Sequence, residues 1–335
     1  MNKHIRSWLA GTTMLVMTAT GAFAEVVLNR GNSADPESLD PHKTSTVYEA
    51  NILRDLFTGL AAQNAKAEVV PGAAESWAKS ADGKTYTFKL RADGKWSDGS
   101  PVTAHDFVFA WQRLVNPETA AEYAYMLAPV VNAEDITAGK KKPEELGIKA
   151  VDDMTLEVQL NAPTPYFLEM LTHQATYAVS KANVEAKGAD FTKPGNLVSN
   201  GAYTLTEFVP NDHIKLTKNP NFFDAANVKI DVVNYVPTED RSTAVKRFEA
   251  GELDMNDDIP TEQLADLKAK FGDQIKIGPY LGTYYYAFKI PKAPWDNAKL
   301  RHAVSMAIDR DYLAEKVWQN AMIPAYSMVP PGVAG

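Results

Sequence analysis

The 335-residue sequence predicts a mixed α/β protein, and two observations support this fold class. Stretches in which apolar and polar residues alternate, as in strands with one buried face, are interspersed with stretches whose apolar residues recur at helical spacing. The composition, with 45% hydrophobic and 23% charged residues, is that of a globular protein. Alternating strands and helices form layered α/β domains, and the length allows two or more of them.

Residues 1–24 have the three-part layout of a secretory signal peptide. Lys3 and Arg6 form a basic start, residues 8–22 are moderately apolar, and Ala22-Phe23-Ala24 is a small-residue cleavage pattern. The apolar run falls short of the roughly 20 residues that a membrane-spanning helix needs. We therefore expect cleavage between Ala24 and Glu25. Because no cysteine is available for a lipid anchor, we expect a protein free in the periplasm.

Charge and cysteine content exclude several classes of function. The chain has 34 Lys and Arg residues against 42 Asp and Glu residues, a net charge of −8, and no cysteine. An acidic surface disfavours nucleic acid as a partner. The absence of cysteine excludes disulfides, thiolate metal sites and cysteine nucleophiles in this chain. No cofactor is expected.

Hydrophobic periodicity and turn residues divide the chain into elements. Single strands are expected at residues 25–30, 86–90, 228–236 and 283–288. Two strands are expected within residues 149–160, and a hairpin over residues 203–216. The expected helices cover residues 47–60, a short turn and helix at 69–77, 104–115, 123–127, a polar helix and loop at 134–147, 166–173, 242–249 and 299–310. The last helix is expected to bury one apolar face, formed by Leu300, Ala303, Val304, Ala307 and Ile308.

The most specific local pattern is residues 96–113, WSDGSPVTAHDFVFAWQR. Asp98-Gly99 suits a tight turn, because glycine adopts backbone angles that other residues resist. Thr103 is a good N-cap, and Asp106 three residues later completes an approximate capping box. Apolar residues at helical spacing follow, so this stretch predicts a strand end, a turn and a helix.

Catalytic motifs are missing from the sequence, including the serine-hydrolase, zinc-protease, phosphate-loop and dinucleotide patterns. Asp254, Asn256 and Asp258 have the spacing of the first ligands of an EF-hand loop. Ile259 and Ala265 stand where that loop needs glycine and glutamate, so calcium binding is rejected. A binding protein is therefore favoured over an enzyme.

The order of residues across the chain resembles that of bacterial extracellular solute-binding proteins of family 5, especially the oligopeptide-binding proteins of ABC importers. Residues 96–113 resemble one signature, and further matches are SLDPHK with RDLFTGL, PGAAESW, NGAY and PWDNAKLRHAVSMAIDR. The resemblance extends over nearly all of residues 26–330. It implies the type II periplasmic-binding-protein fold, with two lobes, an additional small domain and the C-terminal part of the fold missing.

The resemblance also implies a division of the chain. Residues 25–60 and 190–290 would form the first lobe, and 61–189 a small inserted second domain. Residues 291–335 would start the other lobe. A third domain of the family continues from about this point, so we expect the sequence to be the N-terminal portion of a longer protein.

In this family, two lobes close on a ligand, and peptides are held in extended form through their backbone. The resemblance implies a monomeric receptor that captures oligopeptides and delivers them to the permease and ATPase subunits of an ABC importer. A dipeptide, a murein peptide, a nickel complex or haem stays open as the ligand. A signalling receptor and, with less support, a peptide-processing enzyme stay open as functions. The stretches SLDPHK, TAAEYAY and YLGTYYY favour oligopeptides.

Candidate binding residues follow from the resemblance. The hydroxyl of Tyr123 would meet the main chain of the ligand, with a core tyrosine as the alternative. Ser45, Thr46 and Val47 lie in the loop after LDPHK, which would edge the cleft and offer backbone groups for strand-like pairing. His173 would line a side-chain pocket, or be only structural.

Three tyrosines, Tyr280, Tyr284 and Tyr285, flank the crossover toward the other lobe. Alternate residues of a strand face opposite sides, so not all three can face the cleft. His42 is expected to cap a turn in its loop. The acidic residue that would hold the ammonium group of a peptide is expected outside this sequence.

Overall fold

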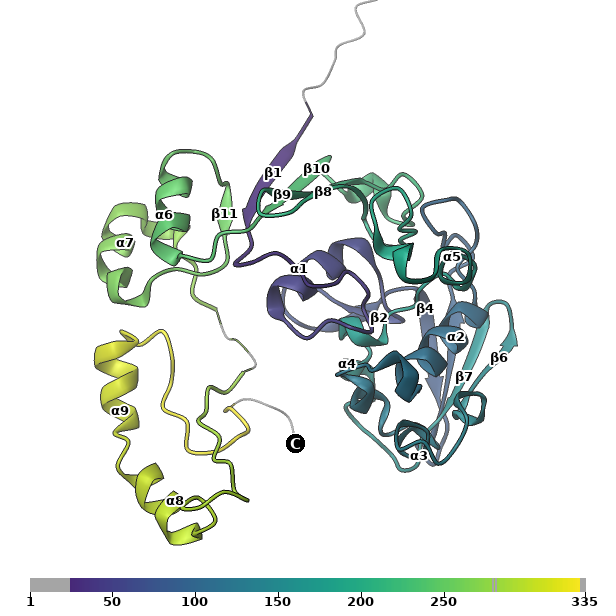
Figure 1. The fold of residues 1–335 in the computed structure, drawn as a ribbon. Helices are drawn as coiled ribbons and strands as arrows, with labels where there is room; N and C mark the ends of the chain where they lie inside the picture. The colour runs from purple at the N-terminus through teal and green to yellow at the C-terminus, as the bar shows by residue number, and fades with distance from the viewer. Residues whose placement is uncertain (1–24, 279, 281, 332–335) are drawn as a thin grey trace, which may run out of the picture.

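The computed structural model describes residues 25–278, 280 and 282–331 (Figure 1). Its helices and strands follow one another in the mixed order that the sequence predicts, which confirms the α/β fold class. The expected signal peptide, including Ala24, lies outside the described residues. Within those residues, no helix combines the length and the apolar character needed to cross a membrane.

The first main sheet has five strands in the order β11-β1-β10-β9-β8. They are β1 (Val27–Gly31), β8 (Tyr203–Val209), β9 (His213–Lys218), β10 (Val232–Val236) and β11 (Met255–Asn256). β1 pairs in parallel with β10 and β11, whereas β8 and β9 form the predicted antiparallel hairpin. Asn211 in the hairpin turn has φ of 62°, a left-handed conformation that asparagine tolerates.

Helix α1 (Val47–Leu56) packs against this sheet through its fully buried Ile52, Leu53 and Leu56. The sequence predicts a helix as far as residue 60, but α1 ends at Leu56. The side-chain amide of Asn200 accepts a hydrogen bond from the Thr58 amide at 2.9 Å and donates to its carbonyl at 3.0 Å. These two bonds satisfy the backbone of Thr58 outside the helix, so the chain continues in extended form.

The second main sheet has four antiparallel strands in the order β4-β5-β7-β6. They are β4 (Ala74–Lys79), β5 (Thr85–Leu90), β6 (Ile148–Asp152) and β7 (Thr155–Gln159), and a separate small pair is formed by β2 (Ala61–Gln63) and β3 (Val69–Pro71). The turn and helix expected at residues 69–77 is wrong, because this stretch forms β3 and most of β4. Trp77 pairs with Phe88 across β4 and β5, and such a ladder partner is not visible in local periodicity.

Helix α2 (Ala104–Val115) packs on this sheet beside β6 and β7 (Figure 1). Phe107 and Trp111 are fully buried, and the Trp111 ring meets Phe167 edge-on at a centroid distance of 6.4 Å. Short helices surround it: α3 (Ala133–Thr137), α4 (Phe167–Met170) and α5 (Lys181–Lys187). This arrangement encloses the core of the second sheet.

The predicted corner at residues 96–113 is confirmed. Gly99 has φ of +88° in the turn, and Trp96 is buried. The Asp106 carboxylate accepts the backbone amide of Thr103 at 3.0 Å and its hydroxyl at 3.2 Å. The same carboxylate oxygen accepts the Trp96 indole at 3.3 Å, so the helix cap also orients the strand end.

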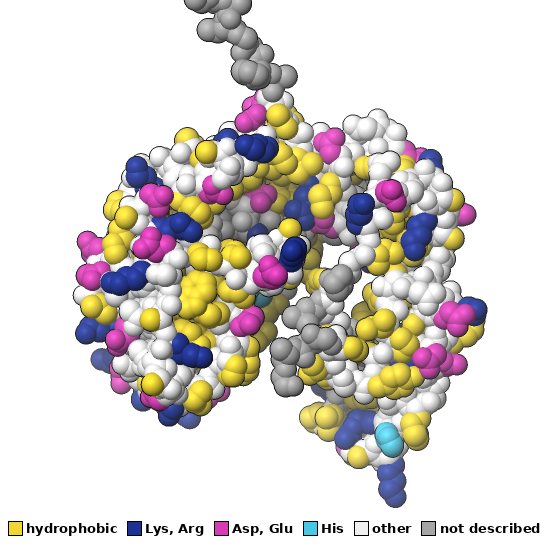
Figure 2. Space-filling model, turned by 180° about the vertical axis from the view of Figure 1, so that it is seen from behind, with side chains coloured by type: hydrophobic (Ala, Val, Ile, Leu, Met, Phe, Trp, Pro, Cys, Tyr) yellow, Lys and Arg dark blue, Asp and Glu magenta, His cyan; other side chains and the backbone are white. Residues whose placement is uncertain are grey.

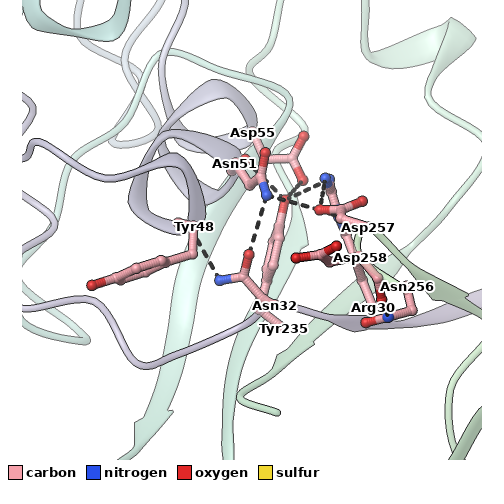
Figure 3. Close-up of polar contacts among 9 residues, drawn as sticks. All are labelled: Arg30, Asn32, Tyr48, Asn51, Asp55, Tyr235, Asn256, Asp257 and Asp258. Atoms are coloured by element: carbon pink, nitrogen blue, oxygen red, sulfur yellow. Dashed lines mark hydrogen bonds and ion pairs between the residues drawn. The ribbon is translucent and has the colours of Figure 1, made fainter. Parts of the chain in front are cut away.

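A polar cluster joins β1, α1 and β10 to the segment after β11 (Figure 3). The Arg30 guanidinium lies 2.6 Å from the Asp257 carboxylate, which also accepts the Asn51 side-chain amide at 2.8 Å. The Tyr235 hydroxyl donates to Asp55 at 2.8 Å, and burial raises the pKa of both groups. Side chains from distant segments therefore fix β11 at the edge of the sheet.

The last part of the chain contains α6 (Arg241–Glu249), α7 (Leu264–Phe271), α8 (Ala298–Met306) and α9 (Arg310–Tyr312). Helices α8 and α9 stand apart from the two sheets in Figure 1. The space-filling view shows a furrow between the part of the molecule that contains these helices and the part that contains the sheets (Figure 2).

Two expectations for this part are wrong. Residues 283–288 form no strand, because no described strand lies alongside to complete a ladder. The helix expected at 299–310 is split into α8 and α9, and none of its expected core residues is buried: Leu300, Ala303, Val304, Ala307 and Ile308.

Candidate functional site

Three of the candidate binding residues meet at one point of the structure. The Tyr123 hydroxyl donates a hydrogen bond to the Ser45 carbonyl at 3.3 Å. The ring of His173 lies against the Tyr123 ring at a centroid distance of 4.7 Å, and Tyr125 lies on it at 5.6 Å. Folding thus brings together the loop before α1, the segment after α2 and the segment after α4.

The imidazole of His173 is held as a neutral ring. Burial, and then the charge of Arg54, lower its pKa to about 4. Its Nδ1 accepts the backbone amide of Ala175 at 3.2 Å, which places the proton of the neutral ring on Nε2. His173 therefore offers a hydrogen-bond donor beside Tyr123.

Residues 45–47 form a short extended edge that leads into α1. Thr46 has φ of −111° and ψ of 157° and is the N-cap of the helix, accepting the Glu49 amide at 3.4 Å. Val47 is 58% exposed. The edge therefore combines a fixed backbone with an open surface.

Glu49, which was not among the predicted site residues, organises this edge. Its side chain is buried, and one carboxylate oxygen accepts the amides of Ser45 and Thr46 at 3.0 Å each. The other oxygen accepts the amides of Glu37 and Ser38 at 3.1 and 3.3 Å. The signal that could have revealed Glu49 is its place three residues after Thr46, the pattern of a capping box.

A second anchor, also not predicted, holds the same loop from the side of α2. Arg113 donates two hydrogen bonds to the Asp40 carboxylate, at 2.9 and 2.5 Å, and one to Nδ1 of His42 at 2.7 Å. Burial is the largest single influence on Asp40 and acts to raise its pKa, but the hydrogen bonds and the charges around this carboxylate, those of Arg113 first, together lower that pKa.

His42 lies in a turn, as expected, but its ring is buried and does more than cap it. With Nδ1 accepting from Arg113, Nε2 donates to the Tyr177 carbonyl at 3.1 Å. Burial lowers its pKa to about 4, against the pull of Asp40 and with the help of the Arg113 charge. His42 therefore ties the loop to the body of the protein.

The other candidates are not part of this cluster. Tyr280, Tyr284 and Tyr285 are 75%, 71% and 60% exposed. No hydrogen bond or ring contact joins them to Tyr123 in the part of the chain that the structure describes. Across the same residues, no group of three or more His, Asp or Glu side chains is arranged to hold a metal ion.

Comparison with known proteins places the chain among solute-binding proteins. Residues 68–335 match the family described as bacterial extracellular solute-binding proteins, family 5 Middle. The chain is 44% identical over 311 residues to the periplasmic oligopeptide-binding protein OppA of Salmonella typhimurium, and the match covers 92% of this chain and 57% of OppA. The chain thus spans little more than half the length of this relative.

Two solved structures superpose on this chain with a TM-score of 0.89 each. One is Haemophilus influenzae OppA in complex with RPPGFSPFR, which is 41% identical, with 93% of this chain and 61% of that chain covered. The other is the murein tripeptide binding protein MppA of Escherichia coli, which is 42% identical with the same shares covered. These structures confirm the expected periplasmic-binding-protein fold.

Proposed function

The chain belongs to the bacterial extracellular solute-binding proteins of family 5, and we propose that the protein captures oligopeptides for an ABC importer. In this proposal an extended peptide lies along residues 45–47, beside Tyr123 and His173. The names of the relatives describe peptide binding and not catalysis, which supports a receptor over an enzyme.

The observation that carries this proposal is which backbone groups at residues 45–47 can still take a hydrogen-bond partner. Ser45 and Thr46 donate their amides to Glu49, and the Thr46 carbonyl accepts from Ala50 at 3.1 Å. The Val47 amide is the first of α1 and has no partner within the helix. The Ser45 carbonyl accepts the Tyr123 hydroxyl and has a second lone pair for another donor. This carbonyl and the Val47 amide, on either side of the extended Thr46, are therefore the groups that can pair with a ligand.

These two groups imply a direction for the ligand. In antiparallel pairing, a residue of the edge would have to offer both its own amide and its own carbonyl to the ligand. In each of residues 45–47, at least one of these two groups is already hydrogen-bonded within the protein. In parallel pairing, one ligand residue donates to the carbonyl of the residue before its partner and accepts from the amide of the residue after it. With Thr46 as the partner, these groups are the Ser45 carbonyl and the Val47 amide. We therefore propose that the peptide runs parallel to residues 45–47 at this edge.

Tyr123 and His173 would complete this contact. A hydroxyl both donates and accepts, so Tyr123 can bond the ligand main chain while it keeps its place beside Ser45. Nε2 of His173 would donate to a carbonyl group of the ligand. We retain Tyr280, Tyr284 and Tyr285 as proposed contacts from the crossover between lobes, and the division into lobes at residues 60, 190 and 290 as part of the same proposal.

The partners and the location follow from the same proposal. A receptor of this kind needs a membrane permease and an ATPase to receive its ligand. We propose that the protein works as a monomer in the periplasm, after cleavage between Ala24 and Glu25. The periplasmic relatives support this location.

The test is thermal denaturation of the full-length protein that contains this chain, with a mixed library of tri- to pentapeptides. A ligand present at 100 times its Kd stabilises the folded state by about 2.7 kcal/mol, so a clear upward shift in Tm is expected. No shift with peptides but a shift with a nickel chelate or haem would contradict the proposal. Mass analysis of the recovered peptide adds a second criterion, because cleaved peptide would indicate an enzyme.

A further inference from the structure

Glu49 is a buried carboxylate that is satisfied by amides and a hydroxyl. It is 2% exposed, and among the described residues no Lys, Arg or His forms an ion pair with it. It accepts four backbone amides and, at 2.8 Å, the hydroxyl of Thr46. Several hydrogen bonds of this kind compensate the loss of hydration of a buried charge.

These bonds go beyond what a helix cap requires. A capping box needs only the bond back to the N-cap amide, here that of Thr46. Glu49 also takes the amide of Ser45 and reaches Glu37 and Ser38 with its second oxygen. It therefore closes the loop 37–46 at both ends and occupies both amides on the edge before Val47.

We infer that Glu49 determines the direction in which an extended ligand pairs with residues 45–47. This inference rests on the proposed function of the same edge. With Glu49 in place, the amides of Ser45 and Thr46 bind its carboxylate and cannot bind a ligand. The Ser45 carbonyl and the Val47 amide remain, and these two groups suit a parallel ligand. Without its carboxylate, Ser45 would offer an amide and a carbonyl together, which is the antiparallel pattern. Glu49 is thus a positioning residue that acts through the backbone.

Asp106 supplies a matched control. It is the corresponding acid of the capping box of α2 and accepts the amide and hydroxyl of Thr103. Its other oxygen accepts the Lys181 amide at 3.3 Å, so it too joins two segments. None of its bonds reaches the edge formed by residues 45–47.

The first experiment compares wild type, Glu49→Ala and Asp106→Ala in the full-length protein, because alanine leaves no acceptor oxygen, whereas glutamine would keep one. Hydrogen exchange is measured at the amides of Ser45 and Thr46, without any ligand. We expect slow exchange in wild type and in Asp106→Ala, and exchange at least 100-fold faster in Glu49→Ala. Unprotected amides in wild type would overturn the inference and would have no bearing on peptide capture.

The second experiment measures affinity for one bound pentapeptide and for analogues in which single backbone amides are replaced by esters. The pattern of losses along the peptide should be the same in wild type and Asp106→Ala. In Glu49→Ala we expect at least tenfold weaker binding and a changed pattern, because a different set of ligand groups finds partners. Wild-type affinity and pattern in Glu49→Ala would overturn the inference while peptide capture stands.

Absence of peptide binding by wild type would instead overturn the proposed function and this inference together. If Glu49→Ala does not fold, Glu49→Asp takes its place, since its shorter side chain cannot span from Thr46 to Glu37. Where exchange shows that this variant releases the amides of Ser45 and Thr46, the pattern of losses along the peptide should change, and where they stay protected it should remain that of wild type. The opposite pairing of exchange and pattern would overturn the inference.

Discussion

Arg113 and Asp40 are 73 residues apart in sequence, yet two hydrogen bonds of 2.9 and 2.5 Å join their side chains. The pair connects the last turn of α2 to the loop that leads into residues 45–47. Both side chains are mostly buried, with 17% of Arg113 and 6% of Asp40 exposed. The candidate ligand edge is therefore supported by an ion pair that little solvent reaches.

Breaking this pair should destabilise the protein strongly. Arg113→Met keeps the length of the side chain but leaves the Asp40 charge buried without its cationic partner, with the His42 amide as a remaining donor. Loss of one member of a buried pair lowers the free energy of unfolding by about 3–5 kcal/mol, which urea denaturation would measure. Lys181→Met is the control, since its exposed pair with Glu185 should contribute at most about 1 kcal/mol. Equal, small losses for both variants would contradict the importance of the buried pair.

The stability of the protein should depend on the protonation of His42. Its pKa in the folded protein is about 4, against 6.5 for an ordinary histidine. Between these values the unfolded chain binds a proton that the folded chain does not, so unfolding becomes easier as the pH falls. The contribution is fully present above pH 6.5 and is lost toward pH 4, which amounts to about 3 kcal/mol for one group.

Urea denaturation between pH 7.5 and 4.5 would measure this effect. Wild type should lose stability across the window, and His42→Gln should lose less. A part of the dependence should remain in this variant, because the pKa of His173 is also lowered to about 4. His213 has the opposite sign, since the hydrogen bond to Asp212 raises its pKa. An unchanged pH dependence in His42→Gln would show that His42 is not the group responsible.

The hydroxyl of Tyr123 should contribute to ligand affinity more than to stability. Tyr123→Phe keeps the ring beside His173 and removes one neutral hydrogen bond, which is worth about 0.5–1.5 kcal/mol. We expect peptide affinity to fall by roughly threefold to tenfold, as measured by calorimetry. Tyr125→Phe is the matched control, because Tyr125 packs on Tyr123 but is 61% exposed. If both variants bind like wild type, the Tyr123 hydroxyl does not contact the ligand.

Gly201 should not tolerate a side chain. A Cβ atom at this position would lie 2.6 Å from the Asp55 carbonyl oxygen and from backbone atoms of Leu56 and Phe57. Because backbone atoms cannot turn aside, Gly201→Ala should lower the free energy of unfolding by about 1–3 kcal/mol or more. Gly278→Ala is the control, since no atom of the described residues lies within 4 Å of the point that its Cβ would occupy. Similar melting temperatures for the two variants would contradict this packing.

Much of the fold could be predicted from local pattern. The cap formed by Thr103 and Asp106, the hairpin at residues 203–216 and the two strands around Asp152 all depend on residues close in sequence. The helix expected at 69–77 failed although its partners are also close in sequence. Its conformation is set by pairing with β2 and β5, and these strand partners override local propensity.

The candidate site was predicted only in part. Tyr123, Ser45 and His173 came from resemblance to a family, and the structure places them together. Glu49 and Arg113 were missed, because each looks like an ordinary helix residue. Their roles arise from loops that pack against their helices.

Residue order thus sufficed to establish the fold class, the family and the helix caps, because these depend on motifs and on neighbours a few positions apart. The ligand edge could not be established in that way. Its geometry depends on Glu49 withholding two amides, on Arg113 holding Asp40, and on the Tyr123 hydroxyl reaching the Ser45 carbonyl 78 residues away. The stretch at residues 96–113 identifies the family, but helix α2 contributes to the site through Arg113 in its last turn. A hydrogen bond between distant segments forms only when the packing of the whole chain brings its donor and acceptor within reach.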